Sequence, residues 1–294
     1  MMIDKFLNYL RYERNASLLT VQNYEAALRE FASYIINMDN SLSLDQVDTD
    51  LIRDWMESLM DKGNSASTIN KKLSALRSFY RFALRRGLVE VDPSHCVTGP
   101  RKDKLLPQFV RESEMERLLD APEWTDNFKD VRARTILILL YEAGIRRSEL
   151  VGLSDGDVDM SRRQLKVTGK RNKQRIIPFG DELAEALRHY IEVRNAEFGG
   201  CDGSALFLGD KGLPLTGAQL YGIVRWHLSA VTSLKKRSPH VLRHTFATAM
   251  LNNGAGLESI KGLLGHESVA TTEIYAHTTF EQLKRVYKEA HPRA

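Results

Sequence analysis

Cysteine is scarce in this chain of 294 residues, which contains only Cys96 and Cys201. The two lie far apart and neither belongs to a C-x-x-C pair, so neither a disulfide framework nor a structural zinc site is expected. Long apolar runs are also missing, since none approaches the roughly 18 residues of a membrane-spanning helix. The N-terminus lacks the apolar core of a signal peptide. We therefore expect a cytoplasmic protein without a membrane partner.

The net charge is only +4, but the basic residues are concentrated in three stretches. Residues 62–104 carry ten Lys or Arg against three acidic residues, whereas 162–175 carry seven and 225–244 carry five with no acidic residue. Contacts with a phosphate backbone depend on local rather than net charge. The pattern predicts DNA binding, with a solvated helix face as the alternative for any one stretch.

Residues 1–92 are predicted to form a helical DNA-binding domain. Apolar side chains recur at helical spacing over residues 20–36, and Asp48 and Gly63 are suited to begin and end the next helix. A further helix opening at Ser65 or Ser67 has one apolar face and basic side chains around the others. The candidate DNA-binding residues on this helix are Lys71, Lys72, Arg77 and Arg81.

Turn residues and a lack of periodicity mark residues 93–106 as a linker, which leaves 107–294 as a second domain. Its segment 130–143 is apolar on all sides, as a buried central helix should be. Residues 164–168 and 174–178 alternate like the strands of a β-hairpin. The predicted fold class is therefore mainly α, with a small β-hairpin or sheet in the second domain.

Further DNA-binding candidates lie in this second domain. The hairpin turn contains Lys170, Arg171 and Lys173, which a hairpin can carry into the minor groove. A helix over residues 216–230 has Arg225 near its end and is suited to the major groove. Its neighbour Trp226 is expected in the core because of the ordinary burial preference of tryptophan.

The stretch from Ser238 onward concentrates the chemistry-bearing residues. Ser238 suits an N-cap and Pro239 the first helical position, so His240 and Arg243 share one face. A helix start with free N–H groups, an imidazole and a guanidinium is a natural phosphate site. His240 and His244 also form an H-x-x-x-H pattern, but the glutamate of a zinc protease is absent, which disfavours a metal.

Two shorter elements are predicted after this helix. Asn253 and Gly254 are suited to end it, and residues 257–264 form a short amphipathic helix. Another helix is expected from Ser268, with Tyr275 near its end among polar and β-branched neighbours. That setting favours an exposed tyrosine hydroxyl.

The motifs P-H-V-L-R-H-T-F-A-T, L-L-G-H and T-T-E-I-Y-A-H, in this order, resemble the C-terminal signature of the tyrosine site-specific recombinases of the phage integrase family, the Xer type most closely. G-I-R-x-S-E-L is similar to the family's first catalytic arginine motif, although Arg147 stands where the family usually has an aliphatic residue. The resemblance implies a two-domain recombinase architecture and chemistry without metal or other cofactor. Lys173 remains a competitor for the catalytic lysine. The implied catalytic residues are Arg146, Lys170, His240, Arg243, His266 and the nucleophile Tyr275.

The same resemblance implies an activity and partners. The enzyme would cleave and rejoin double-stranded DNA through a 3′-phosphotyrosine and a Holliday junction, in chromosome or plasmid dimer resolution or in mobile-element integration. Protomers would form a tetramer on paired sites, with residues 278–294 docking on a neighbour. A second recombinase or a DNA translocase is a further possible partner. The alternatives are a type IB topoisomerase and a non-cleaving architectural or regulatory DNA-binding protein.

Overall fold

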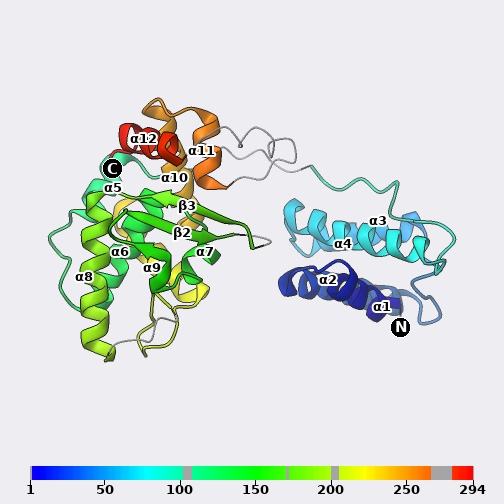
Figure 1. Ribbon diagram of the computed structural model, residues 1–294. Coiled ribbons are helices and arrows are strands. Elements are labelled where there is room, and N and C mark those ends of the chain that lie inside the picture. The colour runs from blue at the N-terminus through cyan, green and yellow to red at the C-terminus, as the bar shows by residue number, and fades with distance from the viewer. Residues whose placement is uncertain (1, 102–107, 170–171, 200–204, 266–279, 294) are drawn as a thin grey trace. The chain divides into compact units, whose positions relative to one another are not determined.

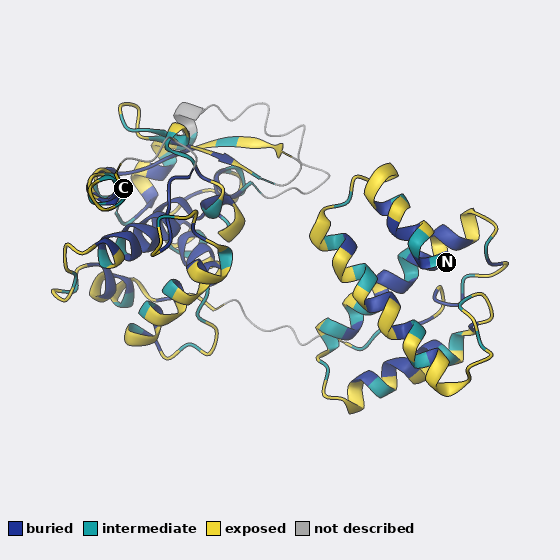
Figure 2. Ribbon diagram, turned by 90° about the horizontal axis from the view of Figure 1, so that it is seen from below, coloured by how far each residue is buried: buried dark blue, intermediate teal, exposed yellow. Residues whose placement is uncertain are grey.

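The computed structural model describes residues 2–101, 108–169, 172–199, 205–265 and 280–293. The chain forms two compact units, residues 1–105 and 106–294 (Figure 1). Each unit contains its own cluster of buried apolar residues. Figure 2 shows buried residues in both units. Helices predominate and the strands form one small sheet, which confirms the predicted fold class. Within the described ranges, no helix is both long and apolar enough to cross a membrane.

The first unit is helical throughout, as predicted. Asp48 and Ser65 act as N-caps, since their side chains accept hydrogen bonds from the backbone N–H groups of Leu51 and Thr68. Phe31 and Trp55 are fully buried and pack with ring centroids 4.8 Å apart. The elements are α1 (Met2–Asn8), a π-helical turn (Tyr9–Glu13), α2 (Leu18–Met38), α3 (Thr49–Asp61) and α4 (Ala66–Arg85).

The second unit is built around one buried helix, α6 (Phe128–Ala143), as the sequence predicted. It packs between α8 (Asp181–Phe198) and α10 (Pro239–Asn252) and ends at Gly144 with φ +56°. A side chain at Gly144 would collide with the ring of Phe246, so glycine lets α10 approach. The other helices in the described part of this unit are α5 (Glu112–Leu119), α7 (Arg147–Val151), a 3₁₀ turn (Asp155–Asp157), α9 (Gly217–Val231), α11 (Leu257–Leu264) and α12 (Phe280–Ala290).

The sheet has three antiparallel strands in the order β1-β2-β3. The predicted hairpin is confirmed with unchanged bounds, as β2 (Gln164–Thr168) and β3 (Gln174–Pro178). The register pairs Leu165 with Ile177 and Val167 with Arg175. The added strand β1 (Val158–Asp159) was not predicted, because two residues are too few to show alternation.

Trp226 is not in the core, so that expectation was wrong. The apolar face of α9 consists of Leu220, Val224 and Leu228, which recur every four residues. Trp226 therefore falls outside that face and is 71% exposed, with its ring edge-on to His227 at 4.6 Å. Helical position prevails here over the general burial preference of tryptophan.

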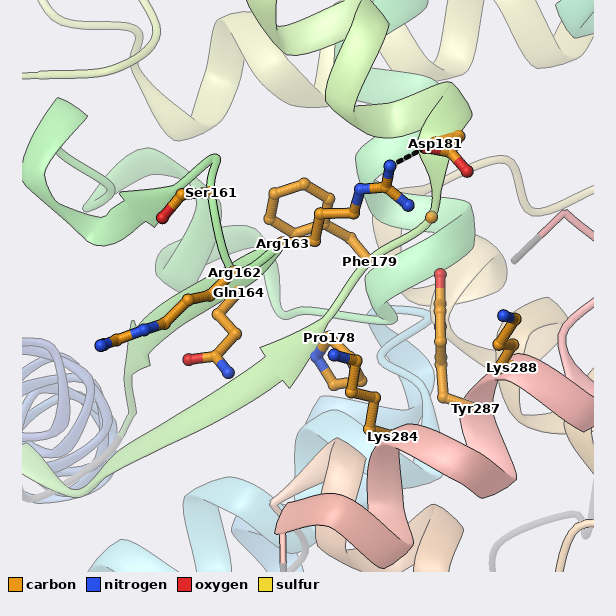
Figure 3. A pocket seen from close by; sticks show the side chains of 11 residues that line it. Ser161, Arg162, Arg163, Gln164, Pro178, Phe179, Asp181, Lys284, Tyr287 and Lys288 are labelled. Atoms are coloured by element: carbon orange, nitrogen blue, oxygen red, sulfur yellow. Dashed lines mark ion pairs between the residues drawn. The ribbon is translucent and has the colours of Figure 1, made fainter.

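The C-terminal helix α12 contacts β3, α10 and α11 of its own chain. The expected docking of residues 278–294 on a neighbour stays a prediction. The Tyr287 hydroxyl donates to a carboxylate oxygen of Glu142 at 3.1 Å. Beyond α12, Arg293 forms ion pairs with Asp120 and Glu182. Between α12 and the base of the hairpin lies a cavity of about 730 Å³ (Figure 3). Of the predicted catalytic residues that the structure describes, Arg146, His240 and Arg243, none lines it.

Candidate active site

Arg243 is a buried arginine on the inner side of α10, with only 6% of its surface exposed. Its Nη1 donates to the Gly144 carbonyl and its Nη2 to the Leu264 carbonyl, both at 2.6 Å. Burial and the nearby cations Arg146 and Arg175 lower its pKa to about 10, so the guanidinium remains charged at neutral pH. The side chain thus links the end of α6 to the end of α11.

Arg146 stands at the N-cap of α7 and reaches the same place from another direction. Its Nη1 donates to Glu149 Oε1 at 2.7 Å and its Nη2 to the Gly265 carbonyl at 2.9 Å. The neighbouring Arg147 is exposed and lies close to Gly217 at the start of α9. The geometry therefore favours Arg146 over Arg147 as the inward-facing arginine.

Glu149 is a buried carboxylate that the sequence analysis did not identify as part of the site. Arg175 on β3 binds it in a bidentate manner, with Nη1 2.9 Å from Oε1 and Nη2 2.8 Å from Oε2. Burial raises the pKa of Glu149, but the hydrogen bonds and charges of Arg175 and Arg146 outweigh it and lower the pKa to about 2. One sequence signal was available: Arg175 alternates with the buried Ile177 along β3, so an arginine occupies an inward position.

His240 lies in the first turn of α10, one turn before Arg243, with its ring open to solvent. Partial desolvation, and then the charges of His244, Arg147, Arg243 and Arg146, lower its pKa. The imidazole is therefore mainly neutral at pH 7 and can accept a proton. The predicted helix start is found at Pro239, although the Ser238 side chain makes no capping hydrogen bond.

The predicted catalytic residues Lys170, His266 and Tyr275, and also Arg171, lie outside the described residues. Two glycines next to them are described. A Cβ at Gly169 would lie 3.3 Å from Glu149 Oε1, and a Cβ at Gly265 would lie 3.2 Å from Arg175. Arg146, Glu149, Arg175 and Arg243 form what we call the arginine–glutamate cluster. The backbone at Gly169 and Gly265 packs against this cluster.

The candidate DNA-binding residues differ in their contacts. Lys71, Arg81, Lys173 and Arg225 are exposed. By contrast, Lys72 forms an ion pair with Glu30 at 2.7 Å, and Arg77 donates to the Val97 carbonyl. Those two side chains are thus already engaged within the first unit. In the part of the chain that the structure describes, no group of three or more His, Cys, Asp or Glu side chains is arranged to hold a metal ion.

Comparison with known proteins assigns both units to one family. Residues 108–282 match the phage integrase family, and residues 3–87 match the N-terminal SAM-like domain of phage integrases. Tyrosine recombinase XerC of Chlorobaculum tepidum is 39% identical over 317 residues, covering 99% of this chain and 94% of the relative. Tyrosine recombinase XerD of Staphylococcus epidermidis is 35% identical, covering 99% of both chains.

Solved structures share the fold. XerA recombinase is 28% identical with a TM-score of 0.50, covering 100% of this chain and 99% of the other. XerH recombinase bound to palindromic difH substrate is 23% identical with a TM-score of 0.73, covering 96% and 83%. The matches favour a recombinase over a type IB topoisomerase or a non-cleaving DNA-binding protein. This chain belongs to the phage integrase family and is a tyrosine recombinase of the Xer type.

Proposed function

We propose that this recombinase cuts and rejoins double-stranded DNA at a specific site, with Tyr275 as the nucleophile. The observation that carries the proposal is the convergence of Arg146 and Arg243 on the last carbonyls of α11, directly before His266. Arginine is permanently charged and fork-shaped, so two of them can hold the non-bridging oxygens of one phosphodiester. The position of His240 beside this pair adds a proton acceptor.

The arginines address the main energetic obstacle to the reaction. A tyrosine with an ordinary pKa of about 10 must lose its proton before attack, which costs roughly 4 kcal/mol at pH 7. Two guanidiniums on the phosphate stabilise the charge that develops in the transition state and offset that cost. Neutral His240 assists removal of the Tyr275 proton, and His266 donates a hydrogen bond to the phosphate.

Cleavage forms a bond between the Tyr275 oxygen and phosphorus and breaks the bond to the 5′ oxygen. Lys170 is the proposed general acid that protonates this oxygen, because an alkoxide is a poor leaving group. The product keeps the energy of the phosphodiester, so a second 5′-hydroxyl can attack the 3′-phosphotyrosine and rejoin the strand. The exchange therefore balances without ATP or a metal ion.

The DNA would be held by basic side chains from both units. The candidates are exposed side chains, which can reach phosphates. They are Lys71 and Arg81 on α4, Lys173 beside the hairpin turn and Arg225 on α9. Solved structures of XerH with difH and of the Tn1549 integrase with transposon DNA support this arrangement, because both share the fold. Assembly would be a tetramer on two paired sites that passes through a Holliday junction. The recombination would serve chromosome or plasmid dimer resolution or mobile-element integration.

The test is a denaturing gel of the wild type and of Tyr275→Phe after incubation with fragmented genomic DNA of the source organism. The proposal predicts a detergent-resistant protein–DNA adduct from the wild type and none from the variant, although both bind DNA. Sequencing the attached DNA then gives the target site. An adduct of equal yield from Tyr275→Phe would contradict the assignment of the nucleophile.

A further inference from the structure

Three arginines from three elements bind three consecutive carbonyl groups at the end of α11. Arg175 Nε on β3 lies 2.8 Å from the Leu263 oxygen, and Arg243 Nη2 on α10 lies 2.6 Å from the Leu264 oxygen. Arg146 Nη2, before α7, lies 2.9 Å from the Gly265 oxygen. The carbonyl end of a helix carries partial negative charge, which favours cations. The chain continues from this point to His266 and Tyr275.

Only two of these arginines are assigned to the phosphate, which leaves Arg175 without a role. All three of its guanidinium nitrogens already donate: Nε to Leu263, and Nη1 and Nη2 to the two oxygens of Glu149. Arg175 is therefore engaged with the protein rather than open to DNA, and any effect on the reaction passes through the groups that it holds.

We infer that Arg175 is a positioning residue that fixes Arg146 and the end of α11 relative to each other. This inference rests on the proposed function of the same site. Arg175 donates two hydrogen bonds to the Glu149 carboxylate, and the same carboxylate accepts one from Arg146. The same guanidinium donates to the Leu263 carbonyl at the end of α11, shortly before His266 in the chain. The planar fork of arginine suits this task, because it serves a carboxylate and a carbonyl in one fixed geometry.

Arg175 is itself a residue of the hairpin strand β3. Thr168 and Gln174 are paired across β2 and β3, and Gly169 N donates to the Lys173 carbonyl at 2.7 Å. Arg175 is the second residue of β3, two positions after Lys173. Its contacts with Glu149 and Leu263 therefore fix the start of β3. One side chain thereby links β3 to Glu149 on α7 and to the end of α11.

The two glycines beside the cluster show how closely these segments pack. Gly265 has φ +63°, and a Cβ there would lie 3.2 Å from Arg175 Cδ and Nη1. A Cβ at Gly169 would lie 3.3 Å from Glu149 Oε1. Both backbones pack directly against the Arg175–Glu149 pair, so a change in its geometry reaches both turns.

The test compares Arg175→Gln and Arg175→Lys with the wild type. The probe is a duplex of the sequence recovered from the wild-type adduct, nicked just 3′ of the cut so that the released fragment diffuses away. DNA affinity should stay within about twofold, because Arg175 does not face DNA. The rate of adduct formation should fall about a hundredfold in Arg175→Gln, because small displacements of catalytic groups have effects of that size. Arg175→Lys should retain part of the rate, since it keeps the charge but not the fork.

A matched control separates positioning from folding. Arg194 on α8 makes the same kind of contacts, binding both oxygens of Asp155 at 2.7 and 2.8 Å and the Leu206 carbonyl at 2.9 Å. None of these partners belongs to the arginine–glutamate cluster. Arg194→Gln should lower thermal stability as Arg175→Gln does, yet leave the rate of adduct formation by the folded protein unchanged. Equal loss of rate in both variants would overturn the inference.

The pH profile gives a second readout, which a purely structural role would not move. The charged groups that face Glu149 are Arg146 before α7, Arg175 on β3 and Arg243 on α10. Without Arg175, Glu149 gains a proton more readily as the pH falls and releases Arg146. The cleavage rate of Arg175→Gln, divided by that of the wild type, should decrease from pH 8 to pH 5.5. Dividing the two rates removes the effect of His240, whose titration affects both proteins alike. A ratio independent of pH would overturn the path through Glu149.

The outcomes also separate this inference from the proposed function. If the wild type forms no adduct, the proposed function fails and the positioning role fails with it, because no cleavage remains for Arg175 to support. If the wild type forms the adduct and Arg175→Gln forms it equally fast, only the positioning role fails.

Discussion

Arg146 Nη1 lies 2.7 Å from Glu149 Oε1, and this arginine is the more exposed member of the pair, at 33% against 1% of the side chain. A buried carboxylate thus holds an arginine whose outer face remains open to a ligand. Because Arg175 binds the same carboxylate, the negative charge is shared between two cations. The arrangement fixes the orientation of Arg146 before any phosphate binds, which is the preorganisation that electrostatic catalysis requires.

Glu149→Gln should therefore destabilise the protein in a pH-dependent way. The pKa of Glu149 is about 2 in the folded protein against an ordinary value of 4.5, so the folded state binds its proton less readily than the unfolded state. The stabilisation is fully present above about pH 4.5 and is lost as the pH falls towards 2. Urea unfolding should show a deficit of about 3 kcal/mol for the variant at neutral pH, shrinking in acid. A deficit that is constant between pH 3 and 7 would contradict the ionised state of Glu149.

Arg243→Ala should lose cleavage far more than DNA binding. Removal of one transition-state donor lowers the rate by about a hundredfold to a thousandfold, whereas many other phosphate contacts sustain affinity. The substitution also leaves the buried carbonyls of Gly144 and Leu264 without this donor, which costs about 1 to 3 kcal/mol each. Cleavage must accordingly be measured below the midpoint of thermal unfolding. Equal losses of affinity and rate would rule out a transition-state role.

Glu142→Gln should stabilise the protein at alkaline pH. Burial raises the pKa of Glu142 from 4.5 to about 8, so the folded state keeps a proton that the unfolded state releases. The stability of the wild type then declines as the pH rises from about 4.5 to 8 and levels off above that. The amide can still accept from Tyr287, so the variant should gain roughly 3 to 5 kcal/mol near pH 8.5 and little near pH 5. Exposed Glu116→Gln is the control, and an equal gain there would refute the effect of burial.

Arg225→Gln should weaken DNA binding without affecting the fold. Arg225 is exposed on α9, so unfolding free energy should change by less than about 0.5 kcal/mol. Loss of one phosphate contact should reduce the slope of log affinity against log salt by about 1. Arg285→Gln on α12 is a matched control, because Arg285 is also exposed and is not a candidate DNA contact. Identical salt slopes for wild type and Arg225→Gln would exclude the contact.

The local signals in the sequence predicted many of the elements. An all-round apolar segment predicted α6, strand alternation predicted the hairpin, and α10 ends before Asn253 as expected. Such features depend on neighbours along the chain. The pairing of Glu149 with Arg175 joins residues that are 26 positions apart, so no local pattern contains it. The same holds for the contact between Arg243 and the end of α6, because only the packed core brings those groups together.

The catalytic set itself was obtained differently, from the resemblance of whole motifs. Spacing alone places His240 and Arg243 on one helical face, and the structure agrees. Spacing does not predict that Arg146, almost 100 positions before Arg243, also binds the end of α11, through the Gly265 carbonyl. Trp226 is exposed because the helical phase of Leu220, Val224 and Leu228 places it outside the apolar face, and this phase outweighs the general burial preference of tryptophan.

The central claim is that Tyr275 becomes joined to the 3′ side of a cut DNA strand without help from a metal ion. The most direct measurement is transfer of label to the protein from a duplex of the recovered site, labelled at either strand end, in the presence of a metal chelator. The account predicts that the 5′-end label becomes attached to the wild type, that the 3′-end label does not, and that Tyr275→Phe acquires neither. Transfer of the 3′-end label, or any transfer to Tyr275→Phe, would contradict it.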